Sequence, residues 1–461
     1  MPINSFLYPG AKVTTGYDVA NSLRFNDGSS DYLTKSFGTT QTSTAKFTVS
    51  VWVKRCTLGT RQSIFAAYDG TSAGGDDLEF ETDDTLSYNG TGAGANTTSA
   101  KFRDPSAWLH IVLARDSSAS GASNQVKIYI NGTLQTLSAN NGCNASQFLK
   151  SGLNSRIGTN QGASQYWVDM YMAELCVIDG QMLDPTSFGE FDEDSPTIWK
   201  PKDVSGLTFG TNGFHLDFEN ASSLGADVSG NSNNFTVNNL TSVDQSTDTC
   251  TNNFATLNPL AVPGASNTFS EGNLEITNSA DANRASFSTI GVSSGKWYYE
   301  CKVLSGEMKQ FIGISKPQES TIRPGDTAGS YGYSAENGKK YNNDSNASYG
   351  SSASSGDIIM VAFDADNGTI WVGKNGTWFN SATQSEIENG TTTNSMYSSI
   401  TIDDFFMMAV SVEDSNVQMN FGSPMYSISS GNSDGNGYGN FEYSVPSGYY
   451  SINTKNLSEF G

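Results

Sequence analysis

Apolar and polar residues alternate along much of this chain with a period of two residues. In the segment 46–54, KFTVSVWVK, four apolar side chains fall on one face of an extended strand and Trp52 falls on the other. Clusters of Gly, Asn, Ser and Asp separate such runs, and no amphipathic helix of ordinary length is visible. Further runs of this kind lie at 108–116, 126–135 and 166–180 in the first half, and at 295–303, 310–315, 356–367, 368–379 and 405–414 in the second. The pattern predicts an all-β protein built from two antiparallel β-sandwiches.

Changes in composition and in the pattern of apolar residues divide the chain into four segments. The first twenty residues have no strand or helix period and are expected to form an extended arm. The connector between the two sandwiches is rich in Gly and Asn turns, but it holds too many aromatic residues for a free linker. The predicted segments are an arm at 1–20, a sandwich at 21–195, a structured connector at 196–267 and a second sandwich at 268–461.

The segment 363–380, FDADNGTIWVGKNGTWFN, opens with closely spaced carboxylates and could be a calcium loop or a β-hairpin. An EF-hand loop needs a glycine at its sixth position and a glutamate at its twelfth, where this sequence has Asn375. Asn-Gly pairs favour two-residue type I′ turns, and both pairs here adjoin alternating apolar residues. We therefore predict hairpin turns at Asn367-Gly368 and Asn375-Gly376, with Asp364 and Asp366 solvated on a strand face.

Composition and charge narrow the functional classes. The chain has 461 residues, with 25 Lys and Arg against 47 Asp and Glu, for a formal net charge of −22. Such a chain repels phosphate backbones and anionic lipids, so no nucleic-acid or membrane partner is expected. The five cysteines lack metal-ligand spacing and suit buried thiols in a reducing cytosol. No signal peptide or membrane-spanning run is visible, so we expect a protein made and soluble in the cytoplasm.

The second sandwich resembles the SPRY domain. The stretches that carry the resemblance occur in the order of the family and span about 268–461: GKWYYE, FIGIS, SYGYSAENGKKYNN, GDIIMVAFDADNGTIWVGKNGTWF and PSGYYSINTKNL. The resemblance implies a bent β-sandwich that binds a partner through loops at one end and has no catalytic residues of its own.

The first sandwich resembles the laminin G-like, concanavalin A-like fold. The resemblance covers 21–190 and lies in SLRFNDGSSDYL, FTVSVWVKR, WLHIVLARD, VKIYINGTLQ and DMYMAELCVIDG. The connector resembles a segment of large bacteriophage virion proteins that joins these two kinds of sandwich. Together they imply a phage tail-fibre type protein, located on the virion after synthesis in the host cytoplasm.

The sequence offers only poorly matching candidates for catalytic residues. Glycoside hydrolases of the concanavalin A-like fold carry E-x-D-x-x-E, because retaining hydrolysis needs two carboxyl groups about 5 Å apart. EFDEDS supplies Glu190 and Asp192 but lacks the last glutamate, and DLEFETD places Asp77 and Glu79 on what we expect to be a solvated strand face. We therefore predict no enzymatic activity. His110 and His215, the only histidines, lie in or beside apolar strands, and His110 is expected to be packed or at an edge.

Calcium is the one cofactor that the laminin G-like resemblance implies, through loop carboxylates and carbonyls. The candidate oxygen donors are Asp27 and Asp31, then Asp69, Asp76 and Asp77, and finally Asp227, Asn231 and Asn233. Asx-turns explain all three groups without a metal, and we favour that interpretation.

Aromatic residues in polar loops are candidates for stacking on sugars. Tyr341 and Tyr349 are the candidate ligand-binding residues, whereas Tyr331 and Tyr333 share one strand face and are expected to be core.

The leading functional hypothesis is a non-enzymatic phage adhesin that binds a host-surface glycan or protein. The arm, residues 1–20, would attach it to other virion proteins, and a homo-oligomer is expected, with three copies the usual number for a fibre. Two alternatives stay open: a capsid or tail decoration protein, and a polysaccharide depolymerase.

Overall fold

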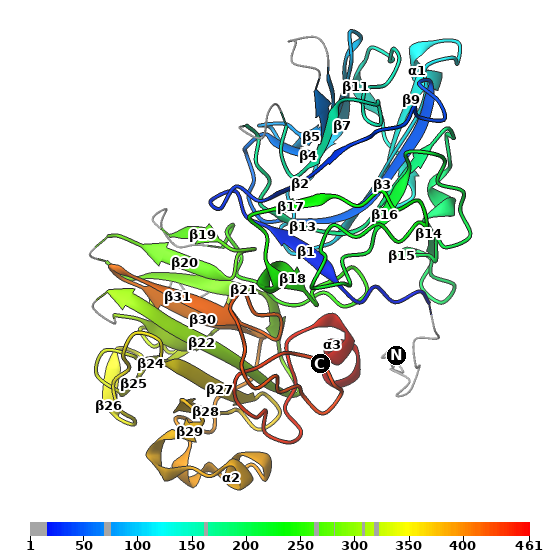
Figure 1. The fold of residues 1–461 in the computed structure, drawn as a ribbon. Coiled ribbons are helices and arrows are strands. Elements are labelled where there is room, and N and C mark those ends of the chain that lie inside the picture. Colours follow the sequence, from blue (N-terminus) through cyan, green and yellow to red (C-terminus); the bar gives the residue numbers. More distant parts are fainter. Residues whose placement is uncertain are drawn as a thin grey trace, which may run out of the picture.

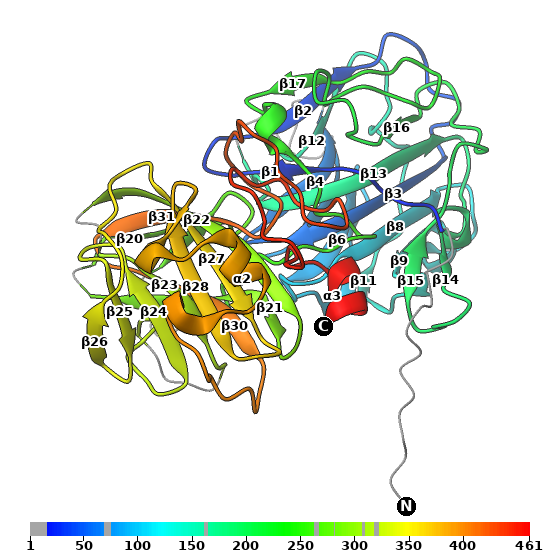
Figure 2. The same ribbon diagram turned by 90° about the horizontal axis from the view of Figure 1, so that it is seen from below.

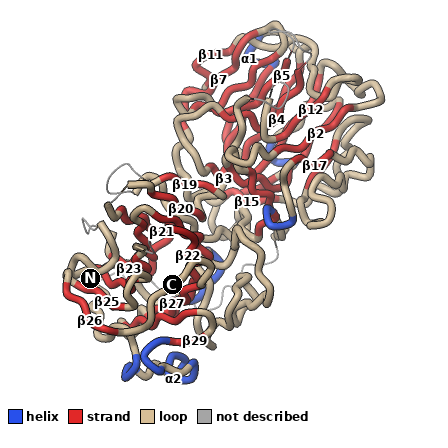
Figure 3. The backbone as a smooth tube through the Cα atoms, turned by 60° about the vertical axis from the view of Figure 1, so that its left-hand side comes forward, coloured by secondary structure: helices blue, strands red, loops and turns tan. Residues whose placement is uncertain are grey.

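The chain folds into two β-sandwiches that lie side by side, the first holding β1–β18 and the second β19–β31 (Figure 1). The computed structural model describes residues 16–68, 75–160, 165–261, 267–280, 282–306, 309–317 and 322–461. Strands dominate, and the helices are short pieces at the periphery (Figure 3). They are α1 (Ala122–Gln125), α2 (Gln384–Glu388) and α3 (Thr454–Phe460). The predicted all-β fold class is confirmed. None of the helices in the described ranges is long and apolar enough to cross a membrane.

Two antiparallel sheets form the first sandwich. The first sheet consists of β10 (Thr133–Leu134), β9 (Val126–Ile130), β8 (Leu109–Asp116), β3 (Lys46–Arg55), β13 (Met170–Asp179), β1 (Ser22–Phe25) and β18 (Gln245–Ser246), with β16 (Phe214–Leu216) also pairing with β13. The second consists of β11 (Leu137–Asn140), β7 (Gly94–Lys101), β6 (Thr85–Gly90), β5 (Gly75–Phe80), β4 (Gln62–Tyr68), β12 (Asn154–Ile157), β2 (Tyr32–Ser36) and β17 (Thr236–Asn238). Their facing side chains, from Leu23 to Leu240, form one buried core.

The second sandwich has the same two-layer plan. One sheet consists of β19 (Thr268–Ser270), β20 (Glu275–Asn278), β31 (Ser415–Asn420), β22 (Lys296–Gly306), β27 (Ile358–Asp364), β28 (Thr369–Lys374) and β29 (Thr377–Trp378). The other consists of β21 (Arg284–Val292), β30 (Phe406–Val412), β23 (Phe311–Ser315), β24 (Ser330–Ser334), β25 (Lys339–Asn342) and β26 (Ser345–Ser348). A smaller apolar cluster, which includes Trp371, Trp378, Ile387 and Phe441, packs outside the main core, where α2 and the C-terminal segment contribute side chains.

Much of the predicted connector 196–267 belongs to the first sandwich, whereas Ala255 and Leu257 near its end pack in the core of the second. The connector strands β16, β17 and β18 pair with β13, β2 and β1, respectively. β15 (Trp199–Pro201) pairs with β14 (Gly189–Phe191), so a hairpin crosses the predicted boundary at residue 195. These strands have only two or three residues, which is too short for an alternating pattern to be recognised in the sequence.

Polar contacts join the two sandwiches. The turn between β19 and β20 reaches the first sheet, where Glu271 accepts a hydrogen bond from Asn26 Nδ2 and lies 3.6 Å from the Arg24 guanidinium. The hydroxyl group of Tyr171 donates to the carbonyl oxygen of Gly272 at 3.1 Å. Near the C-terminus, where α3 lies close to the first sandwich (Figure 2), Lys455 Nζ bonds the Asp18 carboxylate at 2.8 Å. The two sandwiches are therefore joined by these hydrogen bonds as well as by the chain that connects them.

The Asn-Gly turns confirm part of the hairpin prediction. At Asn375-Gly376 the residues have φ of 50° and 79°, and Lys374 pairs with Thr377, which is a two-residue turn. The prediction at Asn367-Gly368 is wrong in type, because Asp364 pairs with Thr369 across a four-residue loop in which only Gly368 has positive φ.

The side chain of Asp364 explains this longer loop, and it is not solvated as predicted. The carboxylate is fully buried and accepts two hydrogen bonds from Asn367, both at 3.0 Å, and Lys296 Nζ lies 3.5 Å away. Asp366 accepts a hydrogen bond from the Gly295 backbone N–H at 2.7 Å. This stretch is therefore a β-hairpin whose loop is stabilised by the carboxylate of Asp364.

Candidate functional site

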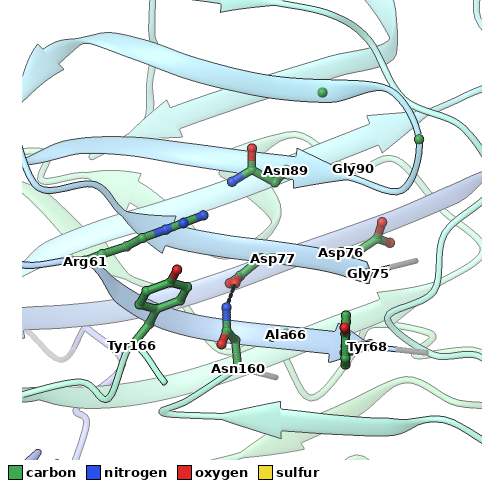
Figure 4. Close-up of a pocket in the computed structure, with 13 residues that line it drawn as sticks. Arg61, Ala66, Tyr68, Gly75, Asp76, Asp77, Asn89, Gly90, Asn160 and Tyr166 are labelled. Atoms are coloured by element: carbon green, nitrogen blue, oxygen red, sulfur yellow. Dashed lines mark hydrogen bonds between the residues drawn. The ribbon is translucent and has the colours of Figure 1, made fainter. Parts of the chain in front are cut away.

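A polar hollow of about 460 Å³ opens on the outer face of the second sheet, over β4, β5 and β6 (Figure 4). Its position follows from strand alternation. On β5 the side chains of Leu78 and Phe80 point into the core, so Asp77 and Glu79 must point to the opposite face. The residues that line the hollow are Arg61, Ala66, Ala67, Tyr68, Gly75, Asp76, Asp77, Asn89, Gly90, Gly92, Gly94, Asn160 and Tyr166.

Several glycine and alanine residues are among those that line this hollow. Gly90 and Gly94 pair directly across β6 and β7, and Gly75 begins β5 beside them. Glycine within a strand marks a place where another group can approach the backbone closely. The aromatic rings of Tyr68 and Tyr166 stand at the border of the hollow, in the same view as the polar side chains (Figure 4).

Carboxylates on β5 are fixed by a hydrogen-bond network. Asp77 accepts from Ser63 Oγ at 2.5 Å and from Asn160 Nδ2 at 2.8 Å. Glu79 accepts from Arg61 Nε at 2.6 Å and also from Arg61 Nη2 and Asn89 Nδ2. The expectation of a solvated strand face is therefore wrong for this pair, since Asp77 is 9% exposed and Glu79 is fully buried. Arg61 and Asn89 cover Glu79, and Ser63 and Asn160 cover Asp77.

Burial sets the protonation behaviour of this pair. Desolvation, followed by the charge of Glu79, raises the pKa of Asp77 well above its usual range. Desolvation also raises the pKa of Glu79, although the hydrogen bonds from Arg61 oppose the shift. Two neighbouring carboxylates in a partly dry site resist carrying two charges at once, so the hollow favours groups that supply hydrogen-bond donors or positive charge.

Tyr166 has an unusual backbone conformation. Its φ is 55°, which is rare for a bulky side chain, and its carbonyl oxygen accepts a hydrogen bond from the Ser63 N–H at 2.9 Å. The Arg61 guanidinium lies 4.3 Å from the centre of its ring. Strained residues persist where surrounding contacts hold them, and they are common at binding sites.

The predicted calcium ligands do not form one cluster. Asp76 and Asp77 belong to β5, whereas Asp31 is buried in the turn after β1 and accepts a hydrogen bond from the Asn26 N–H. Asp27 is exposed in that same turn, and Asp69 lies outside the described residues. In the third candidate group, Asp227 accepts backbone hydrogen bonds from Ser229 and Asn233, as an Asx-type loop does. Within the described ranges, no group of three or more His, Cys, Asp or Glu residues could hold a metal ion.

The two predicted tyrosines of the second sandwich lie in different environments. Tyr349 is buried in the core, where its hydroxyl group bonds the backbone of Val372, so the prediction of a surface ring is wrong at this position. Tyr341 on β25 is half-buried between Phe311 and the Arg323 guanidinium. Tyr331 and Tyr333 pack against or within the core, as expected.

A second, smaller hollow of about 360 Å³ surrounds His215. The imidazole Nε2 lies 3.0 Å from Glu174 Oε2, and His215 pairs across the sheet with Cys176, which is buried. Burial by itself would lower the pKa of His215, but Cys176 and Glu174 outweigh it and raise the pKa above the usual value. Glu174 has a φ of 50° in a β-bulge of β13. His215 and Glu174 therefore form an ion pair that stabilises the fold, and the Cys176 thiol is buried.

Most residues of the main hollow could not be identified from the sequence. Arg61, Asn89, Asn160 and Tyr166 come from separate strands and loops, and none lies in a recognisable motif. Only the carboxylates of β5 stood out, because DLEFETD alternates so regularly.

Comparisons with known proteins identify two domain types. Residues 27–181 match the family model of the concanavalin A-like lectin/glucanases superfamily, and residues 296–424 match that of the SPRY domain. Both domain types that the sequence resembles are thus present. A search of curated protein sequences found no match.

Several solved structures share parts of the fold. The SPRY domain of human HERC1 is 17% identical with a TM-score of 0.29, and the match covers 35% of this chain and 96% of that one. A putative carbohydrate binding protein from Bacteroides ovatus is 14% identical with a TM-score of 0.35, covering 48% of this chain and 59% of that one. A SAP-like pentraxin from Limulus polyphemus is 16% identical with a TM-score of 0.28, covering 36% and 79%.

Proposed function

We propose that this protein is a non-enzymatic binding protein whose first sandwich holds a glycan in the hollow over β4, β5 and β6. The observation that carries the proposal is the combination of two tyrosine rings and several polar side chains in one hollow of about 460 Å³. This size is within the usual range of small-molecule sites. Sugar rings present apolar faces that stack on aromatic side chains and hydroxyl groups that bond carboxylates and amides. The match to a lectin-type superfamily supports this assignment.

The carboxylates argue for binding and against hydrolysis. Retaining hydrolysis needs two carboxyl groups that both reach the glycosidic bond. Glu79 is fully buried, and its oxygens accept hydrogen bonds from Arg61 and Asn89, so it cannot contact a ligand in the hollow. Of the two carboxylates on this strand face, Asp77 would then be the one that faces the sugar, which suits recognition.

At a finer level, we place this protein on the surface of a bacteriophage particle as a tail fibre or adhesin. The resemblance of the connector to virion proteins and the presence of two recognition-type domains support this placement. Residues 1–20 would bind other virion proteins, and a homo-oligomer would multiply weak contacts with the host surface. Antibody labelling of purified particles in the electron microscope tests the placement. Labelled, accessible sandwiches support an adhesin, whereas sandwiches buried among neighbours indicate a decoration protein.

Glycan binding is tested with the full chain on a glycan array, followed by calorimetry. We expect Tyr166→Ala to weaken binding about fivefold, because one aromatic contact contributes about 1 kcal/mol and each 1.4 kcal/mol corresponds to a factor of ten. Tyr341→Ala, in the second sandwich, should leave affinity unchanged. The reverse result would move the site to the second sandwich, and no binding to any glycan would refute the proposal. Unchanged thermal melting controls for folding.

A further inference from the structure

Acceptor groups in the main hollow outnumber the donors that reach them. Each oxygen of Asp77 accepts one hydrogen bond, from Ser63 and from Asn160, whereas a carboxylate can accept about four. Asn160 donates through Nδ2, and its buried Oδ1 has no hydrogen-bond partner in the described part of the chain. Asn160 is 5% exposed, so bulk water does not satisfy this oxygen. Unsatisfied buried acceptors are uncommon and call for a donor.

The cation that lines the hollow, Arg61, is bonded to Glu79 and not to Asp77. Arg61 bonds Glu79 through both Nε and Nη2, and its Nε lies 3.7 Å from Glu81. Among the described residues, none supplies a cation that is bonded to Asp77.

The other carboxylate of the hollow, Asp76, is satisfied by the protein. Asp76 accepts from the N–H and hydroxyl group of Thr91, at 2.9 and 3.0 Å, and from Ser146 Oγ and the Gln147 N–H, at 2.6 and 2.8 Å. Its four acceptor positions are occupied, whereas those of Asp77 are not. The acceptors without enough donors are thus Asp77 and Asn160, whose side chains lie next to each other and are joined by a hydrogen bond (Figure 4).

We propose that the ligand is an amino sugar with a free ammonium group, which binds the Asp77 carboxylate and the amide oxygen of Asn160. An ammonium group carries three donors and a positive charge, so it supplies what both acceptors lack. Around it, Asp76, Asp77 and Glu79 outnumber Arg61, and the same negative balance repels uronic and other acidic sugars. Acetylation of the amine removes both the charge and two of the donors. This inference rests on the proposed glycan-binding function and specifies its ligand class.

Calorimetry with the full chain tests the inference on three matched oligosaccharides: glucosamine oligomers, their N-acetylated counterparts and oligogalacturonate. We expect the free amines to bind at least tenfold more tightly than the acetylated forms, and oligogalacturonate not to bind. Asp77→Asn should remove this preference while binding of the acetylated forms is retained. Glu81→Gln is the matched control, since Glu81 follows β5 but does not line the hollow, and it should leave the preference intact.

The outcomes separate the inference from the proposed function. Equal binding of amine and acetylated sugars, with both weakened by Tyr166→Ala, would overturn the inference and leave glycan binding in place. Tightest binding of oligogalacturonate would also overturn it. Absence of binding to every sugar would refute both. The comparison of sugars uses the unmodified protein, so it decides the matter even if Asp77→Asn does not fold.

Discussion

At the scale of single residues, partners distant in sequence decide what a side chain does. The sequence predicts that His110 is packed or at an edge, and it is packed, stacked on Trp52 with ring centroids 4.6 Å apart. The Trp199 indole N–H donates to its Nδ1 at 2.8 Å, which leaves the Nε2 proton for Ser50 Oγ at 2.8 Å. Burial lowers the pKa of His110 to about 3, so the ring is neutral at physiological pH. The apolar strand predicted the burial, but Trp199, 89 positions away, could not be predicted.

Two glycines of the β27–β29 region give a residue-scale prediction. Both have positive φ, so alanine at either costs about 1–2 kcal/mol of backbone strain. A Cβ at Gly368 would lie 2.1 Å from the Ile400 carbonyl oxygen, whereas at Gly376 it would meet only the Tyr443 ring, at 3.0 Å. We expect Gly376→Ala to lose about 1–2 kcal/mol and Gly368→Ala clearly more, measured by urea unfolding. Equal losses of unfolding free energy would contradict this prediction, because they would mean that the structure shifts to relieve the clash with the Ile400 carbonyl oxygen.

At the scale of elements, β3 shows what an alternating pattern predicts and what it omits. Phe47, Val49, Val51 and Val53 enter the main core and Trp52 packs on the other face, as the sequence predicted. The same strand ends in buried charge, because Lys54 Nζ bonds Asp248 at 2.8 Å and both side chains are 1% exposed. Alternation places Lys54 on the outer face but does not show that the connector covers it.

Removing the Lys54 charge gives an element-scale prediction. In Lys54→Met, Asp248 loses its cation in a buried site, so we expect unfolding free energy to fall by about 3–5 kcal/mol. Lys46→Met on the same strand is the control: Lys46 is 45% exposed and 3.3 Å from Asp116, and its loss should cost no more than about 1 kcal/mol. Chemical denaturation of both variants measures the difference. Similar small losses would mean that water reaches Asp248.

At the scale of the whole molecule, the junction between the sandwiches gathers carboxylates. Burial raises the pKa of Asp31 to about 6 and that of Asp169 to about 7, and burial also raises the pKa of Glu271. The charge of Glu271, from the second sandwich, adds to the shift of both aspartates. The junction thus contains carboxyl groups whose pKa values burial raises toward neutral pH.

This arrangement predicts a pH dependence of stability. Since the folded pKa values of Asp31 and Asp169 exceed the unfolded value of about 3.9, folding favours their protonated state, and stability is lost as pH rises from about 4 to about 7. We expect a higher urea midpoint at pH 5.5 than at pH 8. Asp169→Asn, which keeps an acceptor for Thr57, should flatten the dependence. A midpoint that rises with pH in this window would contradict the assignment.

The sequence by itself determined the longer strands, the turn at Asn375-Gly376 and the two-sandwich architecture, because a period of two and Asn-Gly pairs act locally. Local patterns also placed the carboxylates of β5 on the face away from the core. Only the tertiary structure decided that this face is a hollow and not a solvated surface. Arg61, Asn89, Asn160 and Tyr166 converge there through strand register and loop paths, and contacts between residues nearly a hundred positions apart leave no periodic trace in the chain.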